Sequence, residues 1–359
     1  MANGAVMSLI RTNNRTLDGN QGRRNLVYNG KFQLAQRGTD FDTITTNDYC
    51  LDRWTHVFSG LDGNYDVDQS TTVPTAQGFS NSIKISMDAS ETSLDAADYA
   101  TVQQYFEGQD LQHLLKGTTN AKKLCLSFWV RSSVASTYTV ELKDSDNGRN
   151  IGKSYTISTA DTWEKKVIVF DADTTGTFNN DNGLSLQLIF WIDAGSNFTS
   201  GTFSTAWQAQ ANTERVYDTT GWLESTSPEF YLTGVQMEVG DSPSDFEHRT
   251  YGEELSLCQR YFYSNLHTFF GMPPTSSTVQ VATSIQYPVE MRANPSFSSS
   301  GTPKADPYIG ASITASSSSI AFFNTSKLTA AIQFSNFSGL NTNHPYNVQD
   351  VTVKLDAEL

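Results

Sequence analysis

The stretch Phe230–Tyr263 reads FYLTGVQMEVGDSPSDFEHRTYGEELSLCQRYFY, and the composition of the chain changes where it ends. From Phe230 to Val235, apolar side chains stand among polar ones, a pattern that predicts a β-strand. Gly240 and Pro243 then interrupt the pattern. The first part of this stretch is therefore predicted to be the last strand of a β-domain.

The second part of the stretch, Gly252–Tyr263, predicts a helix. Apolar residues recur there at the i, i+3, i+4, i+7 spacing of one helix face. Glu253 and Glu254 begin the segment and Arg260 lies near its end, which suits the helix dipole. Residues 251–263 therefore form the expected linker helix. We expect it to pack between two domains or between subunits through Leu255, Cys258, Tyr261 and Phe262.

Residues 25–250 carry short alternating segments with turn signals about every ten residues, which predicts an all-β, antiparallel jelly-roll sandwich. In Leu124–Arg131 the apolar side chains alternate, so Trp129 is expected on the opposite face of its strand. The nearly all-apolar Leu184–Ile192 is predicted to be central. The other expected strands are Asn25–Phe32, Asp52–Phe58, Asn64–Asp68, Ser82–Met87, Ala100–Phe106, Tyr138–Lys143, Lys153–Ile157 and Thr162–Phe170.

The segment Ala194–Trp222 is too long for a plain turn and carries five aromatic residues. Two interpretations stay open. The segment is either an ordered loop whose aromatic tip forms a contact surface, or a lid folded down over the core.

Residues 264–359 are expected to form a smaller C-terminal β-domain. It has under a hundred residues and few large aliphatic side chains, so its core alone would be marginal. A homotrimer that buries one face of each copy would supply the missing burial. The expected strands are Thr278–Tyr287, Ile309–Thr314, Ser319–Phe323, Leu328–Phe334 and Val348–Leu355.

Residues 1–24 show no periodicity and are basic, which predicts an arm outside the core. The arm either becomes ordered on a larger partner or is a frayed terminus. We expect an attachment arm, whose basic residues are Arg11, Arg15, Arg23 and Arg24.

The composition excludes several classes of partner. The formal net charge is −14, whereas nucleic acids and anionic membranes attract Lys and Arg. No apolar run reaches the roughly 18 residues of a membrane span, and the N-terminus lacks the apolar core of a secretory signal. We therefore expect synthesis in a cytosol, no nucleic-acid partner and no membrane insertion.

No catalytic residue is predicted. The sequence contains no HExxH pair, no GxSxG elbow and no glycine-rich nucleotide loop. Carboxylates are plentiful, but no pattern marks a glycosidase pair. Cys50, Cys125 and Cys258 are odd in number and widely spaced, which predicts buried free thiols. We expect a protein that is not an enzyme and needs no cofactor.

Residues 144–148 read DSDNG, which begins like a calcium loop with Asp144 and Asp146 at alternate positions. No glutamate closes the loop, because Tyr155 stands at that place. Asn147-Gly148 instead predicts a hairpin turn. The turn is the expected role, and a structural calcium ion at the two aspartates stays an open alternative.

Sugar binding needs flat aromatic side chains that stack on the apolar face of a pyranose ring. Trp54 and Trp191 lie in apolar strands and are expected in the core. The carbohydrate-binding candidates are Trp207 and Trp222 in the long loop, together with Trp129 and Trp163. Ordinary packing is the alternative for each of the four.

Three groups of motifs resemble bacteriophage virion proteins of the tail-fibre and receptor-binding kind, and they occur in the order expected for such proteins. The middle group, LSFWVR at 126–131, resembles the central strand of carbohydrate-binding-module-like jelly rolls. YPVEMRANP at 287–295, which lies after all three groups, resembles the strand that usually follows in such virion proteins. The outer groups are NLVYNGKF (25–32), QRGT (36–39) and DRW (52–54), and then GVQMEVG (234–240), FEHR (246–249), YGEEL (251–255) and LCQRY (257–261).

The resemblance implies a virion structural protein made in the host cytoplasm. It would be a homotrimeric tail-fibre or receptor-binding subunit, anchored to other virion proteins by residues 1–24. Its jelly roll would bind host-surface glycan without covalent chemistry. Two other interpretations stay open: a capsid decoration or fibre protein, and a non-catalytic carbohydrate-binding accessory module of an enzyme.

Overall fold

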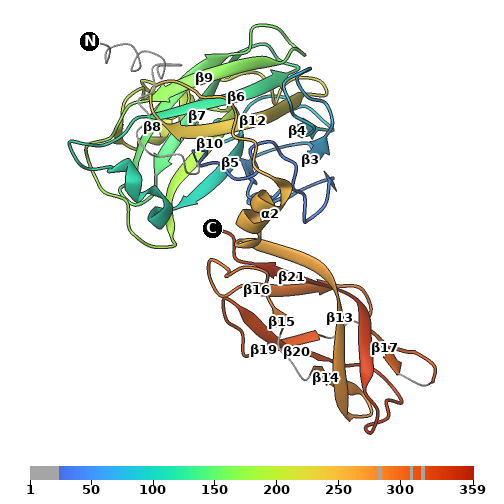
Figure 1. The fold of residues 1–359 in the computed structure, drawn as a ribbon. Coiled ribbons are helices and arrows are strands. Elements are labelled where there is room, and N and C mark those ends of the chain that lie inside the picture. Colours follow the sequence, from blue (N-terminus) through green and yellow to red (C-terminus); the bar gives the residue numbers. More distant parts are fainter. Residues whose placement is uncertain (1–23, 282–284, 308–309, 317–319) are drawn as a thin grey trace, which may run out of the picture.

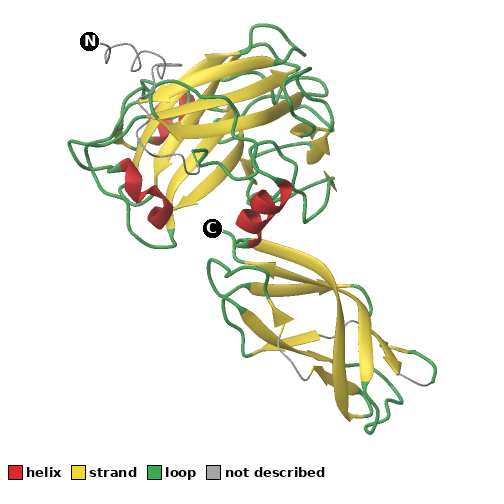
Figure 2. Ribbon diagram, in the orientation of Figure 1, coloured by secondary structure: helices red, strands yellow, loops and turns green. Residues whose placement is uncertain are grey.

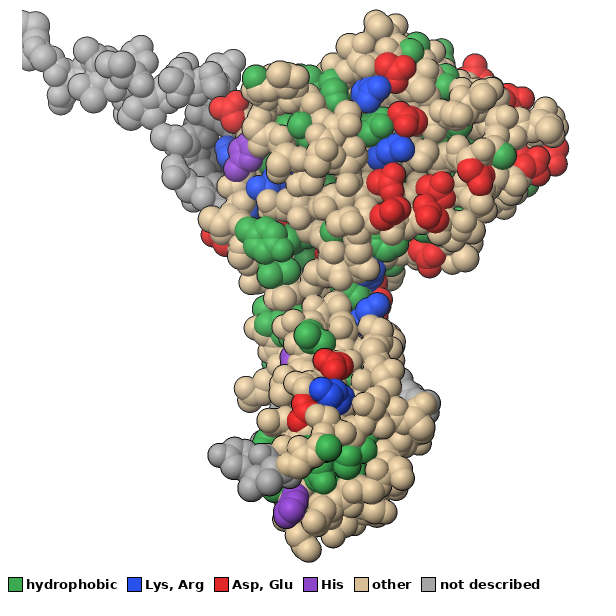
Figure 3. All heavy atoms as spheres, turned by 90° about the vertical axis from the view of Figure 1, so that its right-hand side faces the viewer, with side chains coloured by type: hydrophobic (Ala, Val, Ile, Leu, Met, Phe, Trp, Pro, Cys, Tyr) green, Lys and Arg blue, Asp and Glu red, His purple; other side chains and the backbone are tan. Residues whose placement is uncertain are grey.

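The chain folds into two bodies of β-structure joined by a short helix (Figure 1). The computed structural model describes residues 24–281, 285–307, 310–316 and 320–359. Strands dominate these residues and the helices are few and short (Figure 2), while Figure 3 shows a narrow waist between the two bodies. The predicted all-β class, a jelly-roll sandwich followed by a linking helix and a smaller β-domain, is confirmed.

The first layer of the sandwich is a six-stranded antiparallel sheet in the order β1–β3–β4–β12–β6–β9. The late strand β12 lies between β4 and β6, so neighbours in space are distant in sequence. This interleaving is typical of a jelly roll. The bounds are β1 Asp40–Phe41, β3 Tyr65–Ser70, β4 Ser82–Met87, β6 Leu124–Ser132, β9 Glu164–Phe170 and β12 Glu229–Val239.

The second layer is a six-stranded sheet in the order β11–β8–β7–β10–β5–β2. Strand β10 pairs with β5 on one side and β7 on the other, which confirms its predicted central place. The bounds are β2 Thr55–Ser59, β5 Tyr99–Glu107, β7 Thr137–Asp144, β8 Arg149–Thr156, β10 Leu184–Ala194 and β11 Gln208–Ala209. Short helical segments are η1 Gly108–Leu114, α1 Ser196–Thr199 and η2 Asn212–Glu214.

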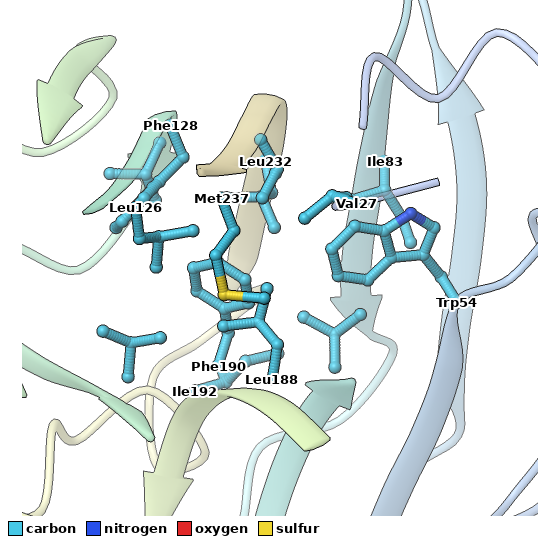
Figure 4. Close-up of a cluster of buried hydrophobic side chains, with 14 of the residues drawn as sticks. Val27, Trp54, Ile83, Leu126, Phe128, Leu188, Phe190, Ile192, Leu232 and Met237 are labelled. Atoms are coloured by element: carbon cyan, nitrogen blue, oxygen red, sulfur yellow. The ribbon is translucent and has the colours of Figure 1, made fainter. Parts of the chain in front are cut away.

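One hydrophobic core fills the space between these sheets. Trp54 closes one side of it, and its Nε1 donates to the carbonyl of Asn29 at 3.3 Å. Each large apolar side chain that is fully buried contributes about 1.5–3 kcal/mol. The residues labelled in Figure 4 come from both layers and from the N-terminal segment: Val27, Trp54, Ile83, Leu126, Phe128, Leu188, Phe190, Ile192, Leu232 and Met237.

The segment Asn25–Phe32, predicted as a strand, is irregular. Asn29 and Phe32 have φ angles of +49° and +53°, outside the β region. The Asn29 side chain explains the kink, because its amide donates to the carbonyls of Leu34 and Asp52 at 3.0 and 3.1 Å. The segment still borders β12 through two backbone hydrogen bonds, Leu26 N to Met237 O and Val235 N to Gly30 O, both 2.8 Å.

The linking helix α2 spans Tyr251–Gln259, so the predicted range Gly252–Tyr263 ran too far. Thr250 caps its start: the Glu253 amide donates to Thr250 Oγ1 at 3.3 Å, and the Thr250 amide donates to the Glu253 carboxylate at 2.9 Å. Beyond Gln259 the chain turns, and a strand begins at Phe262 because pairing with the last strand is available there. Placing Tyr261 and Phe262 on the helix was wrong.

The second body is built on two long strands, β13 (Phe262–Thr275) and β21 (Tyr346–Asp356), which pair from Phe262↔Asp356 to Gly271↔Tyr346. The main strand order is β15–β20–β14–β13–β21–β17–β18, with β16 beside β21 and β19 beside β20. The remaining bounds are β14 Thr278–Val281, β15 Ile285–Gln286, β16 Ser296–Ser300, β17 Lys304–Pro307, β18 Ile313–Thr314, β19 Ile320–Phe323 and β20 Thr329–Phe334.

This second body has a core of its own, separate from that of the sandwich. The predicted strand Thr278–Tyr287 is divided into β14 and β15, and residues 282–284 lie outside the described residues. Parts of two other predicted strands, residue 309 and residue 319, also lie outside them.

Candidate functional site

The outward face of the first sheet carries two of the four predicted tryptophans, Trp129 and Trp163. Leu126 and Phe128 of β6 point into the core, so Trp129 points outward, as its alternation predicted. Trp163 directly precedes β9, which pairs with β6 at Trp129↔Lys165. Both indoles are half-buried. The fold thus brings two predicted residues onto neighbouring strands.

Tyr231 and Arg131 complete this group. Tyr231 lies opposite Arg131 in the sheet, and the guanidinium carbon is 4.9 Å from the centre of the Tyr231 ring. Trp163 meets the same ring edge-on, with ring centres 6.1 Å apart. We call Trp129, Trp163, Tyr231 and Arg131 the aromatic platform. Trp163, Tyr231 and Arg131 position one another by these contacts, and Trp129 is positioned by its strand.

Polar groups border the platform. Lys165 lies opposite Trp129 and is exposed. Lys84 lies opposite Tyr231, with its Nζ 3.3 Å from the carboxylate of Glu229. Burial, and then the hydrogen bond to Glu229, raise the pKa of Tyr231 to about 12, so its hydroxyl stays protonated and donates to Glu229 at 3.0 Å. An apolar surface bordered by donors and acceptors suits a polyhydroxylated ligand.

Trp207, the third predicted tryptophan, lies at a small pocket away from the platform. Its Nε1 donates to the carbonyl of Asp171 at 2.7 Å, and the ammonium of Lys116 is 5.4 Å from its ring centre. The pocket encloses about 20 Å³ beside Phe170 and Phe178. That is room for about one water molecule, so a sugar ring does not fit between Trp207 and the core.

Trp222, the fourth predicted tryptophan, is fully buried in the sandwich core. It presents no face to a ligand, so the prediction of a sugar-binding role is corrected to one of packing. The reason lies in the path of the loop, which returns to the core just before β12.

The long loop between β10 and β12 folds down over the outward face of the second sheet. Arg215 of the loop donates to the buried carboxylate of Glu141 at 2.9 and 3.0 Å, and Trp191 Nε1 donates to Glu141 at 2.9 Å. Phe198 of the loop packs on Trp191 with ring centres 5.3 Å apart. Of the two interpretations of this loop, the structure shows the folded-down one.

The two calcium candidates bind protein groups and do not converge. The carboxylate of Asp144 lies 2.5 Å from the ammonium of Lys116. The carboxylate of Asp146 accepts hydrogen bonds from the backbone and side-chain amides of Asn179, at 2.9 and 2.7 Å. The DSDNG run forms the tight turn between β7 and β8, as the Asn-Gly signal predicted.

The residues predicted to pack between domains lie near the waist. Cys258, Tyr261 and Phe262 are buried, and Leu255 is half-buried. Tyr261 belongs to the sandwich core, while the ring of Phe262 lies 3.5 Å below the guanidinium of Arg37.

The predicted attachment arm falls almost entirely outside the described residues, including Arg11, Arg15 and Arg23. Arg24 is described, and its backbone amide donates to the carboxylate of Glu247 at 2.7 Å.

One network of hydrogen bonds and an ion pair joins residues from the motifs that resemble those of phage virion proteins. Arg249 donates to the Val27 carbonyl at 3.1 Å and pairs with Glu254 at 3.2 Å. Glu254 accepts from the Asn29 amide at 2.7 Å, and Asn29 in turn donates to the Asp52 carbonyl. These motifs therefore join the N-terminal segment, the DRW turn and α2.

Within the residues that the structure describes, no group of three or more His, Cys, Asp or Glu side chains is arranged to hold a metal ion. No helix in this part of the chain is long and apolar enough to cross a membrane. The three cysteines are buried and free, as predicted.

The chain matches no protein-family model, and no curated protein matches its sequence. Several solved structures have a similar arrangement of strands. One is the enzymatically active domain of tailspike protein 4 of bacteriophage CBA120, with 12% identity over 56% of this chain and 22% of that chain, at a TM-score of 0.30.

Two others are carbohydrate-binding modules. A family 61 module in complex with β-1,4-galactotriose shares 8% identity over 61% of this chain and 100% of that chain, at a TM-score of 0.31. The family 11 module of a Clostridium thermocellum cellulase shares 13% identity over 58% of this chain and 98% of that chain, at a TM-score of 0.28. Likenesses of this degree carry no argument about the ligand of this chain.

Proposed function

We propose that this protein is a glycan-binding module that holds its ligand non-covalently on the aromatic platform. The observation that carries the proposal is the placement of Trp129, Trp163 and Tyr231 on one outward sheet face. Stacking a sugar on the two half-buried indoles removes apolar surface from water, while the buried Tyr231 holds Trp163 by its edge-on contact, and Lys165 and the carboxylates nearby bind hydroxyl groups.

The platform lies on a sheet face instead of in a deep pocket. Such a surface suits several consecutive residues of an extended glycan rather than one enclosed sugar ring. Recognition of this kind depends on a few aromatic side chains, whose truncation typically costs more than about 1 kcal/mol each.

The first prediction tests this surface. Trp129→Ala and Trp163→Ala should each weaken binding about tenfold, the equivalent of about 1.4 kcal/mol. Binding is measured by calorimetry against the glycan that gives the strongest signal on a glycan array. Tyr217→Ala is the matched control, because this exposed aromatic residue lies on the loop over the other sheet.

Equal affinity of the wild type and both tryptophan variants for the glycan, with unchanged unfolding temperatures, would rule out the platform as the glycan-binding surface. Release of shortened sugar chains during the incubation would replace the non-covalent proposal with glycan hydrolysis.

We further propose that the protein is a homotrimeric virion component, a tail-fibre or receptor-binding subunit that residues 1–24 anchor to the particle. The motifs that resemble those of phage virion proteins support this placement, and a glycan-binding surface fits host attachment. Electron microscopy of particles with the labelled protein tests it. Density on the capsid lattice would favour the decoration alternative, and absence from the particle would favour an accessory module.

A further inference from the structure

The outward face of β13 carries three large apolar side chains that solvent reaches. Leu266 is 64% exposed, Phe270 59% and Met272 45%. They lie on one face of a single strand, with the exposed Thr268 between Leu266 and Phe270, while Phe269 is buried in the core of the second body. Isolated exposed apolar side chains are common, but a contiguous stripe marks an interaction surface.

The positions on β21 directly beside these side chains are uncharged, and charged side chains stand farther out, with Asp306 opposite Asn347 and Lys354 two residues beyond Thr352. Leu266 lies opposite Thr352 of β21, which lies opposite Ser300 of β16. Phe270 lies opposite Asn347. The stripe, defined as Leu266, Phe270 and Met272, is therefore bordered on the β21 side by small or neutral side chains at these positions. An interface core has this composition, because charged residues are depleted there.

The charge distribution favours a second copy of this chain as the occupant. Residues 264–359 hold four of the 24 basic and five of the 38 acidic residues, a net charge of −1. Residues 1–263 hold the other 20 and 33, a net charge of −13. In Figure 3 the acidic side chains gather on the sandwich, and the lower body shows few charges. Two copies repel through their sandwiches and meet without that cost through their second bodies.

The face is large enough for a specific interface. Strand β13 has 14 residues, so it runs roughly 46 Å at about 3.3 Å per residue. Beside it lie β21 with 11 residues and β14 with 4, and β16 and β17, with 5 and 4 residues, lie beyond β21; with strands about 4.8 Å apart, the face covers roughly 600 Å². This approaches the roughly 800 Å² that each partner buries in a standard interface.

We infer that the β13 face of the second body is the self-association surface of this protein, occupied by the same faces of two other copies around a three-fold axis. The inference is independent of glycan binding, because the aromatic platform lies on the other body. It assigns the contact through which the proposed homotrimer would form.

The second prediction concerns this face. Leu266→Ser/Phe270→Ser in the full chain should convert the assembled wild type to a monomer, as measured by sedimentation equilibrium between 1 and 100 µM protein, concentrations on the order of those at which specific complexes form. Tyr217→Ser, an exposed aromatic of the sandwich, should assemble like the wild type. Thermal unfolding checks that each variant is folded.

A wild type that stays monomeric throughout, or a double variant that assembles like the wild type, would overturn the inference. The monomeric variant should bind a short monovalent glycan as tightly as the wild type. Loss of glycan binding in all variants, with association intact in the wild type, would contradict the proposed function alone.

Discussion

At the scale of single residues, His56 is the side chain whose environment has the clearest physical consequence. Its imidazole is fully buried beside the ring of Tyr65, with ring centres 5.8 Å apart. Within the described part of the chain, neither ring nitrogen has a hydrogen-bond partner. Burial therefore lowers the pKa of His56 to about 3.

The third prediction follows from this shift. The unfolded chain binds a proton at His56 below about pH 6.5, whereas the native state does not do so until about pH 3. The contribution of His56 to stability is therefore full above pH 6.5 and is lost as the pH falls toward 3. At pH 5 the loss is about 2 kcal/mol.

Denaturant unfolding of the wild type and of His56→Phe, at pH 7.5 and at pH 5, measures this loss. The wild type should lose about 2 kcal/mol more than the variant over that interval, because the carboxyl groups titrate alike in both proteins. The same pH dependence in the two proteins would show that His56 is protonated or solvated in the native state.

The four tryptophans show how far single positions could be interpreted from sequence. The alternation of Leu126 and Phe128 sufficed to place Trp129 on the outer face. Trp222 could not be placed, because its burial depends on where a long loop returns to the core. Tyr231 was missed as a platform residue, although its place between Phe230 and Leu232 points it outward. Its contact with Trp163 requires the strand order β12–β6–β9, which local sequence does not contain.

At the scale of elements, one lysine joins the chain after η1 to the end of β7 and to the loop that follows β9. The ammonium of Lys116, just after η1, lies 2.5 Å from Asp144 and 3.0 Å from Asp173. It also donates to the carbonyls of Thr175 and Gly176 at 2.9 and 2.8 Å. Four oxygens thus surround one buried positive charge, and oxygen is also the ligand atom of calcium, which takes about six to eight of them.

The fourth prediction replaces that charge. Lys116→Ala should destabilise the protein by about 3–5 kcal/mol, because it leaves the buried carboxylate of Asp144 without a cation, whereas Asp173 keeps its pair with Arg149. Millimolar calcium should restore part of this stability in the variant and leave the wild type unchanged. Thermal unfolding with calcium or with a chelator measures both effects. Arg131→Ala is the control, since its partner Asp161 is exposed. Calcium stabilisation of the wild type would contradict the role assigned to Lys116.

The sequence predicted short alternating strands well and long mixed elements poorly. Ser82–Met87 has the bounds that its alternation indicated. Strand β13 was missed, because Tyr261 and Phe262 fit a helix face and Pro273 and Pro274 are poor strand residues. Pairing with β21, from Phe262↔Asp356 to Gly271↔Tyr346, decides the conformation of this segment. The conformational preferences of the residues within β13 carry no information about that long-range contact.

At the scale of the whole molecule, the waist is held by two arginines, one fully buried and one half-buried. Arg53 is fully buried, pairs with the carboxylate of Glu358 and stacks on Tyr261 with its guanidinium carbon 3.4 Å from the ring centre. Arg292 donates to the carbonyls of Ala357 and Glu358, each at 2.7 Å. Residues after β21 thus return to the sandwich, and the start of β13 and the end of β21 are both fixed at the waist.

The fifth prediction concerns the coupling between the two bodies. Arg53→Met should cost about 3–5 kcal/mol, because it leaves Glu358 charged, buried and without this partner. The variant should also separate unfolding into two calorimetric transitions, since the bodies have separate cores. Arg53→Met/Glu358→Gln should recover a large part of the loss, because no unpaired charge remains. If the double variant is as unstable as the single one, the stacking of Arg53 on Tyr261, and not its charge, holds the waist together.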